Sequence, residues 1–421
     1  MTRFAYALLW WFATPFAFMR LAWRARRQPG YRERWRERLG FYDAADKVPR
    51  IWIHAVSLGE TRAAAPLVEA LGARFPRHRI LLTHMTPTGR QAGRELFGDR
   101  VERAWLPYDH GFAVRRFLAH FAPDIGIVME TEIWPRLLEE CARAGVPTVL
   151  ANARLSERSA RRYARWPRIT RWALGNLAGI AAQAREDAAR FEALGAGAPF
   201  VMGNVKFDMT VPAEMLTRGA ALREQLGIGR RVWVAGSTRD GEEALLLDAF
   251  VAGSADPSII LVIVPRHPQR FDEVAAAVAA RGLALARRSD NAPVPEQTRV
   301  FLGDSLGEML AYYAASDVVI MGGSLLPFGS QNLIEACAAG RPVIVGPSTF
   351  NFEEAAATAI AEGAAVRVGD AAGAIAEATR LSKDEETRAR MGARGREFVA
   401  AHRGAVERFL EWLARYGPAR D

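Results

Sequence analysis

Short apolar runs alternate with amphipathic helical stretches along almost the whole chain, and this alternation limits the fold more than any other feature. Ile259–Val264 and Val318–Met321 consist of apolar residues alone, without the polar alternation of a strand that has one face in water. Such runs between helices predict parallel sheets that helices cover on both faces. The other expected strands are Ile51–His54, Ile80–Thr83, Arg103–Leu106, Ile125–Met129, Thr148–Ala151, Gly179–Ala182, Phe200–Val201, Val232–Ala235, Ala284–Arg287, Val300–Phe301, Val343–Val345 and Ala365–Arg367.

The length and one interruption in the alternation predict two domains. The 421 residues are too many for one ordinary core. The alternation stops near Asp208–Gly229, so we expect an α/β protein with two doubly wound, Rossmann-like domains that face a cleft. The expected domains are residues 39–207 and 231–421, joined by a linker at 208–230. The last helix of the chain could pack back on the first domain.

Residues 1–38 combine an uncharged aromatic run, Phe4–Met19, with a basic run. A cleaved signal peptide would carry its positive charge before the apolar run, whereas here most of it follows. A buried core helix is the second alternative. A membrane anchor fits best, and Pro15 leaves open whether it spans the bilayer or lies in its interface. The basic run holds +6 of the net charge of +9 (56 − 47), and its arginines are expected to face anionic headgroups: Arg20, Arg24, Arg26, Arg27, Arg32, Arg34, Arg36 and Arg38.

Candidate site residues directly follow the expected strands. In doubly wound domains, ligands bind at the carboxyl ends of the strands. Small residues there let the backbone approach a phosphate, and helix N-termini favour an anion. Each motif alone is weak, because a Gly-Ser pair after a strand is usually a turn, but together they predict one site. The motifs are Ser57-Leu58-Gly59-Glu60, Thr86-Pro87-Thr88-Gly89, Glu130-Thr131-Glu132, Asn152-Ala153-Arg154, Gly236-Ser237-Thr238, Pro265-Arg266-His267 and Gly322-Gly323-Ser324.

Several of these motifs lie in longer stretches that resemble one family. WIHAVSLGE, METEIWP, ANARLSERS, GSTRDGEE, VPRHPQRF and GPSTFNF together resemble the Kdo transferases of lipopolysaccharide biosynthesis. The resemblance implies a GT-B fold and a glycosyltransferase at the cytoplasmic face of the inner membrane of Gram-negative bacteria. Such an enzyme moves Kdo (3-deoxy-D-manno-octulosonic acid) from CMP-Kdo to the lipid A precursor lipid IVA and releases CMP. The acceptor is then expected in the first domain and the donor in the second.

The resemblance assigns the general base to Glu60, which must take a proton from the acceptor hydroxyl. We expect the first turn of a helix to stabilise its ionised form, and Gly59 to leave room for the acceptor. The alternative is a carboxylate that merely caps the helix, worth about 0.3–1 kcal/mol. Lys206 is expected to stabilise charge in the transition state. Of Glu130 and Glu132, one is expected to meet substrate and the other to serve structure, and the sequence leaves open which. The remaining acceptor-side residues are Ser57, Thr88, Gly89 and Arg154, and Arg154 either pairs with these acids or meets the anionic acceptor.

The donor is expected to bind residues of the second domain. Arg266, after Pro265, is the first choice for the phosphate, and Glu335 is expected to accept hydrogen bonds from ribose hydroxyls. Helix capping is the alternative for the residues that open helices. One departure is clear: many relatives have Gly-His-Asn-Pro where this chain has Ser330-Gln331-Asn332-Leu333, so the role of that histidine is in doubt here. The other donor residues are Gly236, Ser237, Leu306, Gly307, Glu308, Gly323, Ser324, Asn332, Leu333 and Ile334.

We expect no metal, no cofactor beyond the CMP-Kdo co-substrate and no nucleic-acid partner. A leaving group with one phosphate needs a divalent cation less than a diphosphate does, and no Asp-x-Asp motif is present. Cys141 and Cys337 have no metal or disulfide spacing, which favours a reducing compartment. Two rival hypotheses are a GT-B enzyme with a UDP-sugar donor and a lipid-binding or scaffold protein without catalysis.

Overall fold

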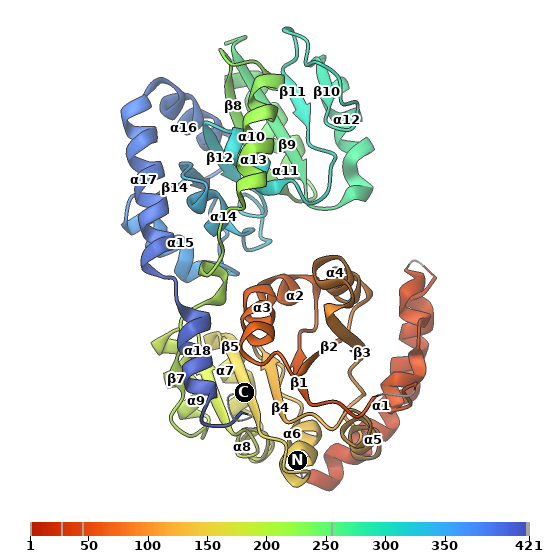
Figure 1. Ribbon diagram of the computed structural model, residues 1–421. Coiled ribbons are helices and arrows are strands. Elements are labelled where there is room, and N and C mark those ends of the chain that lie inside the picture. Colours follow the sequence, from red (N-terminus) through yellow and green to blue (C-terminus); the bar gives the residue numbers. More distant parts are fainter. Residues whose placement is uncertain (1, 27, 44–45, 254–255, 418–421) are drawn as a thin grey trace. The chain divides into compact units, whose positions relative to one another are not determined.

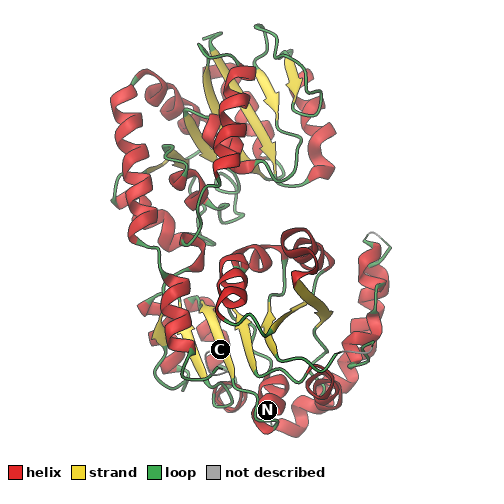
Figure 2. Cartoon of the chain, in the orientation of Figure 1, coloured by secondary structure: helices red, strands yellow, loops and turns green. Residues whose placement is uncertain are grey.

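The computed structural model describes residues 2–26, 28–43, 46–253 and 256–417, which fold into two α/β units (Figure 1). Unit 1 comprises Met1–Asp208 and Arg403–Asp421, and unit 2 comprises Met209–His402. In each unit, helices pack around one central parallel sheet (Figure 2), which confirms the expected GT-B architecture. Arg27, one of the arginines expected to face headgroups, lies outside the described residues.

Unit 1 contains a seven-stranded sheet with the order β3-β2-β1-β4-β5-β6-β7. The strand order reverses between β1 and β4, and at such a switch point doubly wound sheets bind ligands. The strands are β1 (Arg50–His54), β2 (Arg79–His84), β3 (Val101–Trp105), β4 (Ile125–Met129), β5 (Thr148–Ala153), β6 (Gly179–Ala182) and β7 (Phe200–Val201). The helices are α1 (Arg3–Arg24), α2 (Leu58–Ala63), α3 (Ala65–Arg74), α4 (Pro87–Phe97), α5 (Gly111–Phe121), α6 (Pro135–Arg143), α7 (Glu157–Ala164), α8 (Pro167–Leu174), α9 (Arg185–Ala193) and α18 (Ala405–Leu413).

Unit 2 repeats this plan with the order β10-β11-β9-β8-β12-β13-β14, and its switch point lies between β8 and β12. The strands are β8 (Arg231–Thr238), β9 (Ile259–Pro265), β10 (Leu285–Arg287), β11 (Val300–Leu302), β12 (Val318–Met321), β13 (Val343–Val345) and β14 (Ala365–Arg367). The helices are α10 (Ala213–Leu226), α11 (Glu242–Gly253), α12 (Phe271–Ala279), α13 (Met309–Ala315), α14 (Leu333–Ala338), α15 (Glu353–Ala361), α16 (Ala371–Lys383) and α17 (Glu385–Ala401).

The cores explain why uniformly apolar strands are needed. Successive side chains of a strand point to opposite faces of the sheet. Ile51 and Ile53 of β1 join one buried cluster, and Trp52 between them joins the cluster on the other face. The first cluster also holds Phe409 and Leu413 of α18, so the end of the chain completes the core of unit 1.

Several strands extend past their expected ends, and two of them, β5 and β8, by more than one residue. β5 continues to Ala153 and β8 to Thr238, and in both the register shifts near the end, between Leu150 and Ala153 for β5 and between Gly236 and Thr238 for β8. Such irregularities re-aim side chains at a sheet edge. Asn152 and Ser237 therefore lie within irregular strand ends, with positive φ values of 53° and 56°, and not in loops after the strands.

The segment 208–230, expected as a linker, instead contains the 14-residue helix α10 of unit 2. This helix packs on α13, and Gly219 permits the close approach, because a Cβ there would lie 2.5 Å from Ala314 Cβ. At the other end of unit 2, the chain returns to unit 1 through α18. Asp208 accepts hydrogen bonds from the first backbone N–H groups of α18, at 2.5 Å from Gly404 and from Val406.

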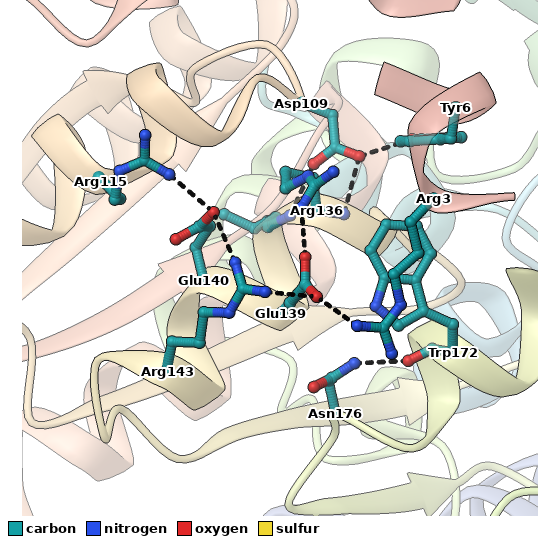
Figure 3. Close-up of polar contacts among 11 residues, drawn as sticks. Arg3, Tyr6, Asp109, Arg115, Arg136, Glu139, Glu140, Arg143, Trp172 and Asn176 are labelled. Carbon is teal, nitrogen blue, oxygen red and sulfur yellow. Dashed lines mark hydrogen bonds and ion pairs between the residues drawn. The ribbon is translucent and has the colours of Figure 1, made fainter. Parts of the chain in front are cut away.

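The N-terminal helix α1 is attached to unit 1 by polar contacts (Figure 3). The Tyr6 hydroxyl donates to buried Asp109 at 2.5 Å, and Asp109 also accepts from the backbone N–H groups of Arg136 and Leu137 at the start of α6. Further along, Thr14 Oγ1 lies 2.5 Å from His110 Nε2. None of the residues of α1 is buried, which rules out the core-helix alternative.

Part of the expected basic surface is internal. Arg38 is 1% exposed, and its guanidinium lies 4.3 Å above the Trp105 ring. Glu37 beside it is also buried and accepts from the Trp105 backbone N–H and from Arg90. The expectation that Arg38 faces headgroups is therefore wrong: this arginine attaches the segment after α1 to β3.

Candidate active site

Glu60 lies in the first turn of α2, directly after β1. Its Oε2 accepts from the Val56 backbone N–H at 2.8 Å, and its Oε1 from the Ser57 hydroxyl at 3.0 Å. Ser57 is the N-cap of α2. A Cβ added to Gly59 would meet no atom nearer than Ser57 Oγ at 3.9 Å, so there is open space beside Gly59, the residue before Glu60.

The pKa of Glu60 is raised to about 7. Burial is the main cause, the negative charge of Glu130 adds to it, and the hydrogen bonds from Val56 and Ser57 oppose it. The expectation that the helix start stabilises the ionised form is thus outweighed, because desolvation and a like charge both favour the neutral acid. A carboxyl group with a pKa near 7 is well matched to accepting a proton at neutral pH.

Glu130 and Glu132 follow β4 and contact different partners. Glu130 has a φ of 57°, and its Oε1 lies 3.9 Å from Lys206 Nζ. Glu132 accepts from Trp134 Nε1 at 2.9 Å, and burial is the main cause that raises its pKa. The charges of both acids raise the pKa of Glu60, that of Glu130 more than that of Glu132. Glu130 also lies beside Lys206, whereas Glu132 is bonded to the Trp134 ring.

Amide side chains at the ends of β5 and β6 hold the turn Val205–Phe207 that carries Lys206. Asn152 Oδ1 accepts from the Val205 backbone N–H at 3.2 Å, and the Asn152 carbonyl accepts from Gln183 Nε2 at 2.9 Å. Asn204 donates to Gln183 and caps the Lys206 N–H at 3.0 Å. The sequence singled out Asn152 as a residue that follows a strand but gave no sign of Gln183 or Asn204, since these contacts join segments about 20 to 50 residues apart.

The other acceptor-side residues differ in accessibility. Gly89 is buried, and a Cβ there would lie 3.1 Å from the Ser57 carbonyl carbon, so Gly89 serves the packing of α4 on the Ser57 turn. Thr88 is exposed on the first turn of the same helix. Arg154 lies beside the Glu130-Thr131-Glu132 segment, because its carbonyl accepts from the Thr131 hydroxyl.

In unit 2, the expected donor residues gather at the carboxyl ends of β8, β9 and β12. The Arg266 backbone N–H donates to the Thr238 carbonyl at 2.9 Å, which joins the ends of β8 and β9. Pro265 is buried as the last residue of β9. Gly236 is needed where it stands, because a Cβ would lie 2.8 Å from the Tyr313 ring.

Gly323 and Ser324 direct their polar groups inward. Ser324 is fully buried: its hydroxyl donates to the Met321 carbonyl and accepts from the Gly346 N–H. The Gly323 N–H donates to Glu242 Oε2 at 2.6 Å. The Ser324 hydroxyl and the Gly323 N–H thus bond within the loop, and donor binding by these two residues stays a prediction. Sequence reasoning also missed Glu242, a fully buried carboxylate that organises this loop.

The two remaining stretches expected to bind the donor, 306–308 and 332–335, could offer a ligand mainly backbone groups. Leu306 is 75% exposed and Gly307 has open space around it, while Glu308 is paired with Arg288 at 3.1 Å. At the start of α14, Asn332 accepts from the Ile334 N–H and donates to Glu335 Oε1 at 3.0 Å. The side chains of Leu333 and Ile334 are fully buried, so only their backbone could meet a ligand.

Ser330, where the family resemblance leads one to expect glycine, has a φ of 71° and is 1% exposed. A non-glycine residue in the left-handed conformation destabilises the folded state by about 1–2 kcal/mol. Glycine removes this strain but loses more conformational entropy on folding, which offsets about 0.5–1 kcal/mol of the gain. We therefore expect Ser330→Gly to raise the free energy of unfolding by up to about 1 kcal/mol, measured by urea denaturation. Ser316→Gly is the matched control, because this buried serine has a φ of −82° and should only lose stability. An equal decrease of the free energy of unfolding in both variants would show that the backbone of Ser330 is not strained.

Among the residues that the structure describes, no group of three or more His, Cys, Asp or Glu side chains lies where it could hold a metal ion. The metal-free step stays a prediction.

Comparison with known proteins identifies the family. Residues 33–209 match the sequence profile described as "3-Deoxy-D-manno-octulosonic-acid transferase (kdotransferase)", and residues 245–398 match "Glycosyl transferases group 1". The 3-deoxy-D-manno-octulosonic acid transferase of Bordetella pertussis is 48% identical over 374 residues, 86% of each chain. That of Haemophilus influenzae is 37% identical over 99% of each chain. The crystal structure of Anabaena Alr3699/HepE with UDP is 14% identical and shares the fold alone, with a TM-score of 0.58 over 87% of this chain and 100% of its own. The chain therefore belongs to the 3-deoxy-D-manno-octulosonic acid (Kdo) transferase family.

Proposed function

We propose that the protein transfers Kdo from CMP-Kdo to lipid IVA at the cytoplasmic face of the inner membrane, with inversion at the anomeric carbon and without a metal. The observation that carries this proposal is the Glu60 carboxyl group at the end of β1, whose pKa is about 7 and whose neighbour Gly59 has open space beside it. Membership of the family supplies the reaction class.

In the proposed step, the acceptor hydroxyl oxygen attacks the anomeric carbon of Kdo while Glu60 takes the hydroxyl proton. The bond from that carbon to the phosphate oxygen breaks, and CMP leaves with the electron pair. Lys206, held beside Glu130, stabilises the negative charge that develops. Glu130 is thus the acid that we place at the reaction, and Glu132 has a structural role.

For the donor, we propose that Arg266 binds the single phosphate and that Glu335, at the start of α14, accepts from the ribose hydroxyls. A guanidinium can form two parallel hydrogen bonds with phosphate oxygens, which supplies charge without a cation. Leu306 and Gly307 offer exposed backbone for the nucleotide. The acceptor base belongs to unit 1 and the donor groups to unit 2, so each substrate has a unit of its own.

We propose that α1 lies in the membrane interface and does not span the bilayer. The helix is long and apolar enough to cross a membrane by length and composition. However, its bonds to Asp109 and His110 attach it along unit 1, and a spanning helix would lose them. Its other face exposes large apolar side chains suited to the boundary between headgroups and acyl chains: Phe4, Leu8, Leu9, Phe12, Phe16, Met19 and Trp23.

Removing residues 1–23 is expected to release the protein from anionic vesicles while leaving CMP binding intact, as measured by sedimentation and calorimetry. The double variant Phe12→Ser/Phe16→Ser tests the face itself, since both side chains are about two-thirds exposed (68% and 67%). Burying a phenylalanine contributes about 1.5–3 kcal/mol, so we expect vesicle affinity to fall at least tenfold. Retention of the truncated protein on vesicles at high salt would contradict the proposed anchor.

The function is tested by mass spectrometry of lipid IVA after incubation with CMP-Kdo and the protein, with and without excess chelator. We expect a product heavier by whole Kdo units and the same rate in both arms. A rate that falls in chelator would overturn the metal-free step alone. Thermal protection by UDP but not by CMP would favour a UDP-sugar enzyme, and CMP binding without turnover would favour a non-catalytic protein.

A further inference from the structure

Arg239, in the stretch GSTRDGEE, has no role in the site described so far. It follows β8, and its backbone N–H donates to Glu242 Oε2 at 2.8 Å. The same carboxylate oxygen accepts from the Gly323 N–H at 2.6 Å, and its partner oxygen accepts from the Leu325 N–H at 2.9 Å. Glu242 is fully buried. Glu242 therefore links the backbone of Arg239 to the loop that follows β12 by hydrogen bonds.

The side chain of Arg239 extends across this loop. A Cβ on Gly323 would lie 3.5 Å from Arg239 Cγ, so the arginine stem passes directly over the glycine. Its guanidinium carbon lies 4.8 Å above the centre of the Phe328 ring. A guanidinium that is stacked on an aromatic ring still has its N–H groups, which lie in the guanidinium plane, available for a planar partner.

No carboxylate of the described residues forms an ion pair with Arg239. The nearby Arg270 has the opposite environment, with acidic oxygens of Asp240, Glu243 and Glu273 at 3.1–3.2 Å. Arg239 is partly exposed. It thus carries a positive charge that is held in place by packing but not neutralised.

Arg239 and Arg266 leave the sheet at the same edge. Thr238 and Pro265, the residues before them, are partners in the β8–β9 ladder. Besides burial, the charges of Arg239, Arg266 and Arg270 lower the pKa of the neighbouring His267. Arg239 therefore adds a positive charge, not neutralised by an ion pair with any described residue, to the edge of unit 2 from which Arg266 also extends.

We propose that Arg239 binds the carboxylate of the Kdo sugar, as a second anion site beside the phosphate site of Arg266. This inference rests on the proposed function, in which the donor carries one phosphate and one carboxylate. Two separate arginines match two separate anions, and a guanidinium binds a carboxylate through two parallel hydrogen bonds. Arg239 then makes the site select nucleotide-linked sugar acids over neutral nucleotide sugars.

The proposal predicts a difference between two ligands, since CMP has the phosphate but lacks the sugar carboxylate. We would measure the dissociation constants of CMP and CMP-Kdo by calorimetry without acceptor. In Arg239→Gln, the affinity for CMP-Kdo should fall about ten- to 100-fold, whereas CMP affinity should change less than about threefold. Arg239→Lys should lie between. Arg266→Gln should weaken both ligands, and the surface control Arg281→Gln should change neither.

Equal weakening of CMP and CMP-Kdo in Arg239→Gln would overturn the carboxylate assignment, and so would no change in either. A melting temperature close to wild type separates these outcomes from misfolding, and Arg239→Lys provides a second variant. Failure of the proposed function would look different, because wild-type protein would then bind CMP-Kdo no more tightly than UDP-sugars or transfer no Kdo.

Discussion

Replacing the proposed base by its amide, in Glu60→Gln, is expected to lower kcat on the order of 10³-fold while the protein stays folded. The amide oxygen can still accept from Val56 or Ser57, but the side chain can no longer take a proton. Burial of a charge next to Glu130 is also removed, so the free energy of unfolding should not fall. The measurements are kcat with CMP-Kdo and lipid IVA, and thermal unfolding. Activity within a few-fold of wild type would remove Glu60 from the role.

The raised pKa of Glu60 gives a second readout of the same assignment. Because the base acts only when ionised, kcat/KM should fall about tenfold per pH unit below pH 7 and level off above it. Glu130→Gln removes a like charge, so the pKa of Glu60 should decrease and the midpoint should move to lower pH. The shift should be partial, since burial is the larger cause. An unchanged or raised midpoint would show that another group controls the profile.

The fold was largely predictable because its information is local. A run such as Val318–Met321 is buried on both faces of a parallel sheet, so its composition alone marks the strand, and β12 has those bounds. Helix α10 was missed because the alternation stops at residues 209–212, and the whole segment was therefore expected to be a linker, although a regular helix begins directly after it. The attachment of α1 was also missed, because it depends on Asp109, a residue about 100 positions away.

The position of the candidate residues at the strand ends was predictable from the sequence, but their electrostatics were not. Strand ends and glycine-rich turns mark the edge of each sheet, and most of the expected residues lie there. Whether a polar group faces a ligand or the interior depends on packing, so the sequence could not show that the Ser324 hydroxyl and the Gly323 N–H bond within their own loop. The raised pKa of Glu60 could not be predicted for the same reason: the sequence shows the helix start, which favours the ionised form, but not the burial that outweighs it.

Lys206→Met is expected to lower kcat by about 10²–10³-fold with little effect on CMP affinity. Methionine keeps most of the length of the stem but removes the charge that the amide frame of Asn152 and Asn204 holds beside Glu130. CMP affinity should be spared because the proposed phosphate ligand, Arg266, belongs to the other unit. The measurements are single-turnover rates and calorimetry with CMP.

A double-mutant cycle with Glu130→Gln then shows whether Glu130 and Lys206 act on the rate as an interacting pair or independently. If Glu130 acts by holding Lys206, then Glu130→Gln/Lys206→Met should be hardly slower than Lys206→Met alone, because the second change removes an interaction that is already lost. If instead the two losses multiply, Glu130 contacts substrate independently and the 3.9 Å pair is incidental. Lys206→Arg provides the charge control: it should recover part of the rate, since a guanidinium keeps the charge but not the shape of the ammonium group.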